Sequence, residues 1–171
     1  MRYSSIVLFV LFLFPVVAFA EPLTPRPLDD FSVTAFARAL AESPTVRSLV
    51  ETIERSNVIV HIVSSREMRS QIGGMTRFVV SRGGYRYVRI TLNAELPPGS
   101  RTAILAHELQ HASEIAASDA DDQESVRRLF EQAGSRDGDT YETRAAQLVE
   151  KTVAVEVRGA LMAARSLQGE Q

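Results

Sequence analysis

Two histidines stand four residues apart in the segment AHELQH, residues 106–111, with a glutamate directly after the first. Residues four apart in an α-helix differ by about 40° around the axis and about 6 Å along it, so His107 and His111 project from the same face of successive turns. Two imidazoles in that arrangement reach one Zn²⁺ at about 2 Å. Glu108 lies about 100° round the helix from His107, a position that suits a carboxylate taking a proton from a metal-activated water as it attacks a carbonyl.

The competing interpretation is an amphipathic helix on whose solvated face the two histidines are incidental. On the far side of the predicted helix, apolar residues recur at helical spacing: Leu105, Leu109, Ala112 and Ala116. This stripe is the face expected to meet the core, and the histidines and the glutamate group elsewhere. The separation favours a functional role for the polar group.

A catalytic zinc site uses three protein ligands, so one more His, Asp or Glu must come from another element. The segment YETRAA, residues 141–146, supplies Glu142 at the predicted start of the last helix. Ala145 and Ala146 follow, and their small side chains would let that helix pack closely on the histidine helix. We therefore expect the Glu142 carboxylate to reach the metal.

HExxH on one helix, completed by a Glu on a following helix, resembles the gluzincin type of the zincin metallopeptidases. The resemblance implies that His107, His111 and Glu142 bind zinc and that Glu108 is the general base for hydrolysis of a peptide or amide bond. The expected partner is thus a protein or peptide substrate. The resemblance also implies that an edge strand just before the motif helix, here YRYVRITLN, residues 85–93, binds an extended peptide by strand addition.

The resemblance covers residues 85–146 and has departures. The longer thermolysin-like pattern carries an Asp four residues after the glutamate ligand, where this chain has Ala146. The hydrogen-bond partner of a ligand histidine must then come from elsewhere. The metzincin extension HExxHxxGxxH fails, since Glu114 replaces its glycine and Ala117 its last histidine.

Two other carboxylates compete to be the third ligand. Glu114 lies on the histidine helix itself, and one rigid helix is poorly shaped to wrap three ligands around one ion. Asp137 lies in GSRDGDTY, residues 134–141, which is similar to the ligand loop of the aspzincins but has one extra residue before Tyr141. The sequence favours Glu142 and keeps Asp137 as the alternative.

The elements before the motif predict a sheet with helices. Apolar residues at helical spacing over residues 31–55 predict two short helices, or one broken at Pro44. NVIVHIV, residues 57–63, is typical of a strand covered on both faces. TRFVVSRGGYRYVRITLN, residues 76–93, predicts a hairpin that turns at Gly83-Gly84.

The elements that follow complete the expected domain. Ser100 is a candidate N-cap for the histidine helix. A long helix over residues 141–165 is predicted to close the domain, with an apolar face made by Ala145, Leu148, Val155 and Met162. Together the elements predict an α+β, zincin-like domain with a small, largely antiparallel sheet and the HExxH helix packed on the C-terminal helix.

The first twenty residues have the order of a secretory signal peptide: Arg2, then an apolar run, then small residues at Ala18 and Ala20. The apolar stretch is shorter than the roughly 20 residues of a membrane span. We therefore expect cleavage after Ala20, a secreted or periplasmic protein, and no membrane association after cleavage. An extended, proline-containing leader over residues 21–30 then precedes one domain over residues 31–171.

Composition narrows the partners and the function. A net charge of −2 gives no basic surface for nucleic acid, so none is expected as a partner. The absence of cysteine excludes disulfides, so stability must come from the core. The expected function is an exported zinc-dependent hydrolase, and the alternative is a binding or interaction protein on the same scaffold with catalysis lost. An intact Glu108 favours the enzyme.

Overall fold

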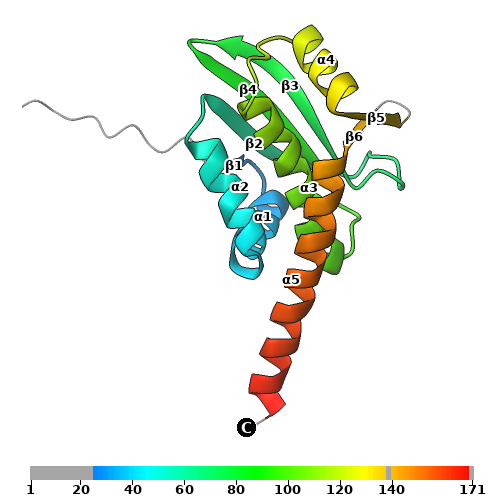
Figure 1. Cartoon of the computed structure of the whole chain (residues 1–171). Helices are drawn as coiled ribbons and strands as arrows, with labels where there is room; N and C mark the ends of the chain where they lie inside the picture. Colours follow the sequence, from blue (N-terminus) through cyan, green and yellow to red (C-terminus); the bar gives the residue numbers. More distant parts are fainter. Residues whose placement is uncertain (1–24, 138–139, 170–171) are drawn as a thin grey trace, which may run out of the picture.

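The described part of the chain, residues 25–137 and 140–169 of the computed structural model, forms five helices and six strands. Their order is β1 (Arg26–Pro27), α1 (Asp30–Glu42), α2 (Pro44–Glu54), β2 (Val58–Ser65), β3 (Gly74–Arg82), β4 (Tyr85–Asn93), α3 (Pro98–Ala116), α4 (Gln123–Ala133), β5 (Gly134–Asp137), β6 (Thr140–Thr143) and α5 (Arg144–Gly169). The α+β class is confirmed (Figure 1). The predicted signal peptide lies outside the described residues.

The main sheet has the strand order β1-β2-β4-β3, in which β1, β2 and β4 are parallel and β3 is antiparallel to β4. The prediction of a largely antiparallel sheet is therefore wrong, because β4 inserts beside β2 and a parallel pairing leaves no turn signal in the sequence. This insertion makes β4 an inner strand. The expectation that residues 85–93 offer a free edge to a peptide is also wrong, since the edge strand is β3.

The predicted hairpin between β3 and β4 is confirmed. Gly83 and Gly84 both have positive φ, 62° and 81°, the conformation that a tight two-residue hairpin turn requires. A bulge between Phe78 and Val80 shifts the register of β3 by one residue. Before the bulge, Thr76 and Phe78 pair with the buried Ile90 and Val88 of β4 and so lie on the face that meets the helices.

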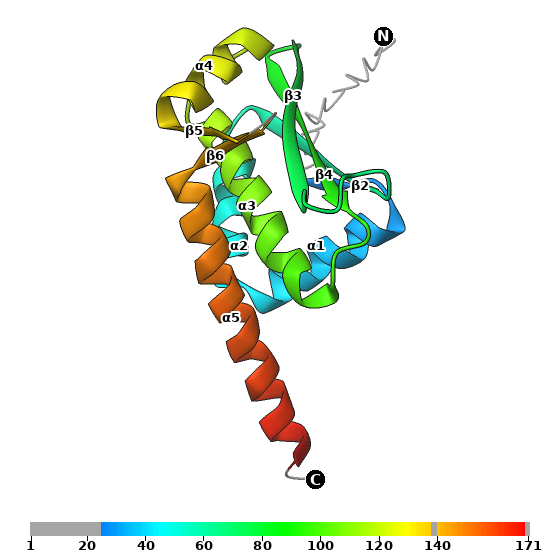
Figure 2. The same ribbon diagram turned by 90° about the vertical axis from the view of Figure 1, so that its right-hand side faces the viewer.

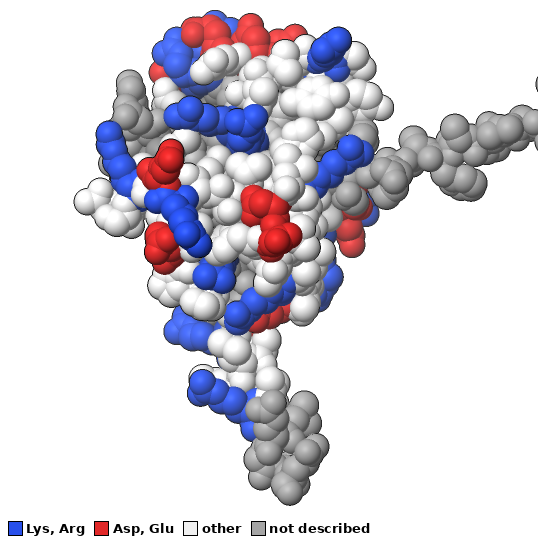
Figure 3. All heavy atoms as spheres, turned by 180° about the vertical axis from the view of Figure 1, so that it is seen from behind, with Lys and Arg blue, Asp and Glu red and all other residues white. Residues whose placement is uncertain are grey.

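The helices cover one face of the main sheet (Figures 1 and 2). Six fully buried residues of β2 and β4 form that face: Val58, Val60, Ile62, Val88, Ile90 and Leu92. Alternate residues of β4, such as Arg89 and Thr91, are exposed or half-buried. On the same face of β2, Ile59 is buried but His61 and Val63 are half-buried, so the expected cover on both faces of residues 57–63 is present only in part. The view from behind shows side chains of both charge signs among uncharged ones (Figure 3).

The first two helices break at Pro44, as one of the two expected arrangements requires. Ser43 caps α2 by accepting a hydrogen bond from the backbone N–H of Val46 at 3.0 Å. Glu156 of α5 accepts hydrogen bonds from the hydroxyls of Ser43 and Thr45. A carboxylate at a helix N-terminus is favourable for the helix dipole, so this contact ties α5 to α2.

The histidine helix α3 begins at Pro98, after Pro97, and not at a Ser100 N-cap as expected. Proline is suited to the first position of a helix because its missing N–H has no partner there anyway. At the other end, the buried Arg86 of β4 donates hydrogen bonds to the carbonyls of Ile115 and Ser118. The α3 axis is thus fixed against the sheet at its C-terminal end.

Asp29 joins α1 to the sheet, and its loss should destabilise the fold. Its carboxylate accepts hydrogen bonds from the backbone N–H of Ser32 at 2.9 Å and of Ser64 at 2.7 Å, the second at the end of β2. We predict that Asp29→Ala lowers the free energy of unfolding by about 2 kcal/mol in urea titrations. Asp122 is the matched control, because it caps α4 in the same way but is not hydrogen-bonded to a strand. Equal losses in the two variants would contradict the role of the Ser64 contact.

The same carboxylate gives the fold a pH dependence in acid. Burial raises the pKa of Asp29, but its hydrogen bonds with Ser32 and Ser64 outweigh that effect and hold the pKa below its ordinary value. Its contribution is therefore complete above the unfolded-state pKa, near about 4, and is lost as the pH falls through the folded-state pKa. Asp29→Ala should consequently cost less stability at pH 2 than at pH 7.

Helix α5 packs on α3 by a different face from the one predicted. Its buried apolar residues are Ala146, Val153 and Val157. The predicted face is exposed and comprises Ala145, Leu148, Val155 and Met162. The helix carries two apolar stripes, and the one made of small and β-branched residues allows the closer approach to α3. The C-terminal part of α5 runs beyond the body of the domain (Figure 2).

No helix of the described residues is long and apolar enough to cross a bilayer.

Candidate metal centre

The two histidines of α3 lie in the interior, one turn apart. His107 is 6% exposed and His111 is 5% exposed. The rings meet edge to face, and the two Nε2 atoms are 3.2 Å apart. The expected convergence of the two imidazoles is therefore present.

Glu142 reaches the same place from strand β6. Its Oε2 lies 3.3 Å from Nε2 of His107, and its side chain is 29% exposed. The prediction that Glu142 starts the last helix is wrong, since it lies in the β5–β6 ribbon just before α5. The two strands approach closely because Gly134 has no side chain, and a Cβ there would overlap the carbonyl of Glu142.

Each ring also contacts a carboxylate through its Nδ1 atom. His107 Nδ1 lies 2.9 Å from Oε2 of Glu150 on α5, and His111 Nδ1 lies 3.0 Å from Oε2 of Glu114. The hydroxyl of Thr143 donates to Oε1 of Glu114 at 2.7 Å and fixes that carboxylate from the other side. An ionised carboxylate only accepts hydrogen bonds, so both Nδ1 atoms carry hydrogen.

This assignment leaves three acceptor atoms facing one another. With hydrogen on Nδ1, a neutral imidazole bears its lone pair on Nε2. The Nε2 atoms of His107 and His111 and the Oε2 atom of Glu142 then meet at 3.2 and 3.3 Å. Such a contact is repulsive unless positive charge lies between the acceptors, as a proton on one ring or as a metal cation. A proton shared by the rings and a bound metal cation would each relieve that repulsion.

Two of the separations between these atoms suit a tetrahedral ion. Ligand atoms 2.0–2.1 Å from a tetrahedral Zn²⁺ lie about 3.3 Å apart, and two sides of the His107, His111 and Glu142 triangle have that length. The third side is open, because the ion pairs of the described residues include none between His111 and Glu142. As they stand, no three His, Cys, Asp or Glu side chains of the described residues form a complete metal-binding group.

Of the two carboxylates that contact the rings through Nδ1, one was a candidate site residue in the sequence and the other was not. Glu114, a competing third ligand in the sequence, instead contacts the Nδ1 of His111 and lies away from the Nε2 atoms. Glu150 was missed. It follows the buried Ala146 by one turn and so shares the face of α5 that meets α3, and an acidic residue on a core-facing stripe is the signal that would have found it. Glu150 therefore supplies the hydrogen-bond partner of His107 that the thermolysin-like pattern would place at position 146, where this chain has alanine.

Glu108 is enclosed between α3 and β3 and is 6% exposed. The hydroxyl of Thr76 on β3 donates to its Oε2 at 2.7 Å. Gly74, on the same strand, leaves the room it needs, since a Cβ there would lie 2.7 Å from Cγ of Glu108. Burial raises the pKa of Glu108, against the opposing effects of His111 and of the Thr76 hydrogen bond.

Four carboxylates surround the two imidazoles: Glu108, Glu114, Glu142 and Glu150. The ion pairs of the described residues give none of the four an Arg or Lys partner. Burial alone lowers the pKa of His111, but the Glu114 hydrogen bond and the surrounding carboxylates raise it above its ordinary value. The cluster therefore favours positive charge at its centre.

Glu142 is the one member of the cluster that lines a hollow of about 490 Å³, whose other lining residues are Gln132, Ala133, Gly134, Ser135, Arg144 and Gln147. Glu142 thus links the buried histidines to solvent. A larger hollow of about 600 Å³ lies at the β3–β4 turn and the end of α3, and none of the residues that line it belongs to the cluster. Neither hollow is lined by His107, His111 or Glu108.

The remaining sequence candidates lie outside this cluster or outside the described residues. His61 pairs in register with Arg89 on the uncovered face of the sheet, opposite the helices. The side chain of Asp137 lies outside the described residues. In comparisons with known proteins, no family model, curated protein or solved structure matches this chain.

Proposed function

We propose that this chain is an exported zinc-dependent hydrolase of the metallopeptidase type, with a zincin-like site of the gluzincin kind. The observation that supports it is the meeting of His107 Nε2, His111 Nε2 and a Glu142 oxygen, with each ring held through Nδ1 by a further carboxylate. Histidines that ligate metals commonly donate their other ring N–H to a carboxylate in this way. Two incidental histidines would not need such support.

The side chains present suit zinc as the cofactor. Two imidazoles and one carboxylate are a usual ligand set for catalytic Zn²⁺, which when bound acidifies a water and polarises a carbonyl. His107, His111 and Glu142 would hold it. Glu142 is the ligand with room to move, since its side chain is 29% exposed, and a turn toward His111 would complete the set.

Glu108 would act as the general base. It would accept the proton of the water that attacks the substrate carbonyl and then transfer that proton to the leaving amine. Thr76 orients the carboxylate through its hydrogen bond. A binding protein on the same scaffold, the alternative function, has no need for a buried acid held in this way, so Glu108 favours the enzyme.

The substrate would be a protein or peptide that binds along β3. That strand is the edge of the sheet, and its Thr76 contacts Glu108. An extended peptide paired with the free edge of β3 would pass beside the general base. This replaces residues 85–93 as the expected substrate strand.

Loss of either ring-supporting carboxylate should weaken the site without removing a ligand. We predict that Glu150→Ala and Glu114→Ala each reduce zinc affinity about 10- to 100-fold in competition with a chromogenic chelator. Glu51→Ala is the control, because Glu51 is an exposed carboxylate on α2. Wild-type affinity in both test variants would show that neither carboxylate supports a ligand.

Export is part of the proposal, with cleavage after Ala20 and a mature protein in the periplasm or the medium. N-terminal sequencing of the exported protein should begin at Glu21. Recovery of the chain in a membrane fraction with Met1 retained would contradict the signal-peptide interpretation.

The enzymatic proposal is tested with a generic peptide library, incubated with the purified protein before and after treatment with a chelator. We expect cleavage that the chelator abolishes and added zinc restores. A protein that retains zinc but cleaves no peptide would support the catalytically silent alternative.

A further inference from the structure

The outer face of the main sheet, the one away from the helices, carries a row of three arginines and one histidine. The register places one member on each strand: Arg26 on β1, His61 on β2, Arg89 on β4 and Arg77 on β3. Their neighbours along β2 and β4 are buried against the helices, so the side chains of the row project outward. Seen from behind, the molecule shows Lys and Arg side chains with uncharged ones between them (Figure 3). The row thus brings cations from three strands into one line.

Two of these cations, Arg77 and Arg89, are directly opposite each other, and like charges in that arrangement destabilise a sheet. Both are exposed, and no ion pair of the described residues involves either. Among those residues, the Arg77 side chain has one hydrogen bond, from Nε to the sulfur of Met75, which is a weak acceptor. Burial and the charges of Arg26 and Arg89 lower the pKa of His61. The row therefore favours an incoming negative charge.

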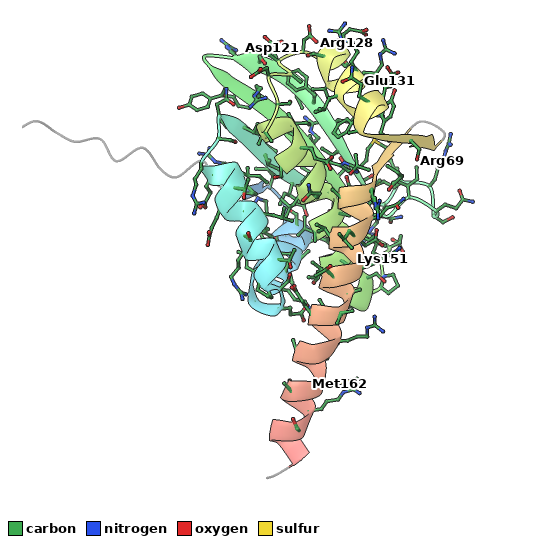
Figure 4. The ribbon with its side chains drawn as sticks, in the orientation of Figure 1. Arg69, Asp121, Arg128, Glu131, Lys151 and Met162 are labelled. Atoms are coloured by element: carbon green, nitrogen blue, oxygen red, sulfur yellow. The ribbon has the colours of Figure 1, made fainter. Side chains whose placement is uncertain are left out.

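Protection of the sheet edge does not account for this pair. A cation on an edge strand discourages pairing with other chains, which would explain Arg77 but not Arg89, because β4 is an inner strand. Asp121 lies by the start of α4, at the turn end of the hairpin (Figure 4). Its backbone carbonyl accepts a hydrogen bond from Ser81, four residues and about 13 Å along β3 from Arg77. The pair therefore suits a carboxylate from another molecule.

The free edge of β3 would bring such a carboxylate next to Arg77. The backbone N–H of Asn93 donates to the carbonyl of Gly73, and this bond fixes which backbone groups of β3 point toward β4. Those of Arg77 point toward β4, and those of Thr76 and Phe78 point to the free edge. A peptide strand bonded to Thr76 would therefore place its next side chain beside Arg77, at the closer spacing of a pair without mutual hydrogen bonds.

We propose that Arg77, with Arg89 one strand farther in, recognises an Asp or Glu of the peptide that pairs with β3. This inference rests on the proposed hydrolase and on its use of β3 as the substrate strand. The peptide residue opposite Thr76 points to the side of the sheet where the Thr76 hydroxyl reaches Glu108. Its neighbour in the peptide points to the outer face, opposite Arg77. The substrate class is thus an extended peptide with an acidic residue next to the one that faces Glu108.

The test uses two short peptides in which threonine alternates with a charged residue, aspartate in one and lysine in the other. Binding is measured by fluorescence anisotropy with the Glu108→Gln protein, so that a bound peptide stays intact. We expect the aspartate peptide to bind about tenfold more tightly at low salt, with a smaller difference at high salt. Arg77→Glu should reverse the preference. Arg26→Glu, the same change at the far end of the row, should keep it.

Equal binding of the two peptides, or binding of neither, would overturn the proposal. Equal loss of aspartate-peptide binding in Arg26→Glu and Arg77→Glu would do so too, because the peptide would then lie across the outer face and not along β3. Cleavage of a peptide library by the wild-type protein separates this inference from the hydrolase. Cleavage without enrichment of Asp or Glu near the cleaved bond would contradict the role of Arg77 alone. Preferential binding of the aspartate peptide without any cleavage would contradict the hydrolase and support recognition by Arg77.

Discussion

Glu108→Gln is expected to reduce kcat for peptide hydrolysis by about 10²- to 10⁴-fold while zinc binding is retained. The amide keeps the size of the side chain and can still accept the Thr76 hydrogen bond through its oxygen. It cannot take a proton from water. Because Glu108 is not one of the three proposed ligands, the metal content should remain that of the wild type.

The experiment compares steady-state hydrolysis and zinc content of the variant with those of Glu67→Gln, which alters an exposed carboxylate. Hydrolysis at the wild-type rate in Glu108→Gln would show that the base is another group. Loss of zinc together with activity would instead place Glu108 among the ligands.

Glu142→Ala is expected to weaken zinc binding by more than about 100-fold, a larger loss than that from a carboxylate that only supports a ligand. The variant removes the carboxylate oxygen that lies 3.3 Å from Nε2 of His107 and leaves two of the three protein ligands of a catalytic site. Hydrolysis should fall with the metal content. Glu142→Asp keeps the charge at a shorter reach and should retain an intermediate affinity.

Asp137→Ala is the decisive comparison, because Asp137 is the alternative ligand from the sequence. Wild-type zinc affinity is expected, measured by the same chelator competition. If Asp137→Ala releases the metal and Glu142→Ala retains it, the gluzincin-type ligand set is replaced by an aspzincin-type one.

Local patterns predicted the elements well. The glycine pair at residues 83–84 marked the hairpin turn, Pro44 marked the helix break, and the apolar stripe of Leu105 and Leu109 marked the buried side of α3. The pairing of β4 with β2 is non-local, so the sequence pattern did not determine it. The predicted orientation of the strands was therefore wrong, although the hairpin between β3 and β4 was predicted correctly.

The buried face of α5 was predicted wrongly for a different reason. The helix has two apolar stripes, and the sequence prediction places the stripe with larger side chains, Leu148 and Met162, in the core, although both are exposed. Close packing on α3 instead selected Ala146 and Val153. Sequence periodicity cannot rank two such stripes, because the choice depends on the shape of the helix they meet.

Within the site, spacing alone placed the two histidines together because both lie on one helix. Glu142 was found as a residue, but its strand was not, because the close approach of β5 and β6 depends on Gly134. Thr76, the hydrogen-bond partner of Glu108, comes from a distant strand and left no signal in the motif. The contributions of residues on other elements could therefore be identified only once the fold was known.

The most direct test of the central claim is zinc titration of the metal-free protein, followed by calorimetry, for the wild type and for His107→Ala/His111→Ala. The account predicts one zinc ion per wild-type chain and loss of that binding in the double variant, with circular dichroism showing that both remain folded. A folded wild-type protein that binds no zinc, or a double variant that binds it as tightly as the wild type, would contradict the proposed metal centre.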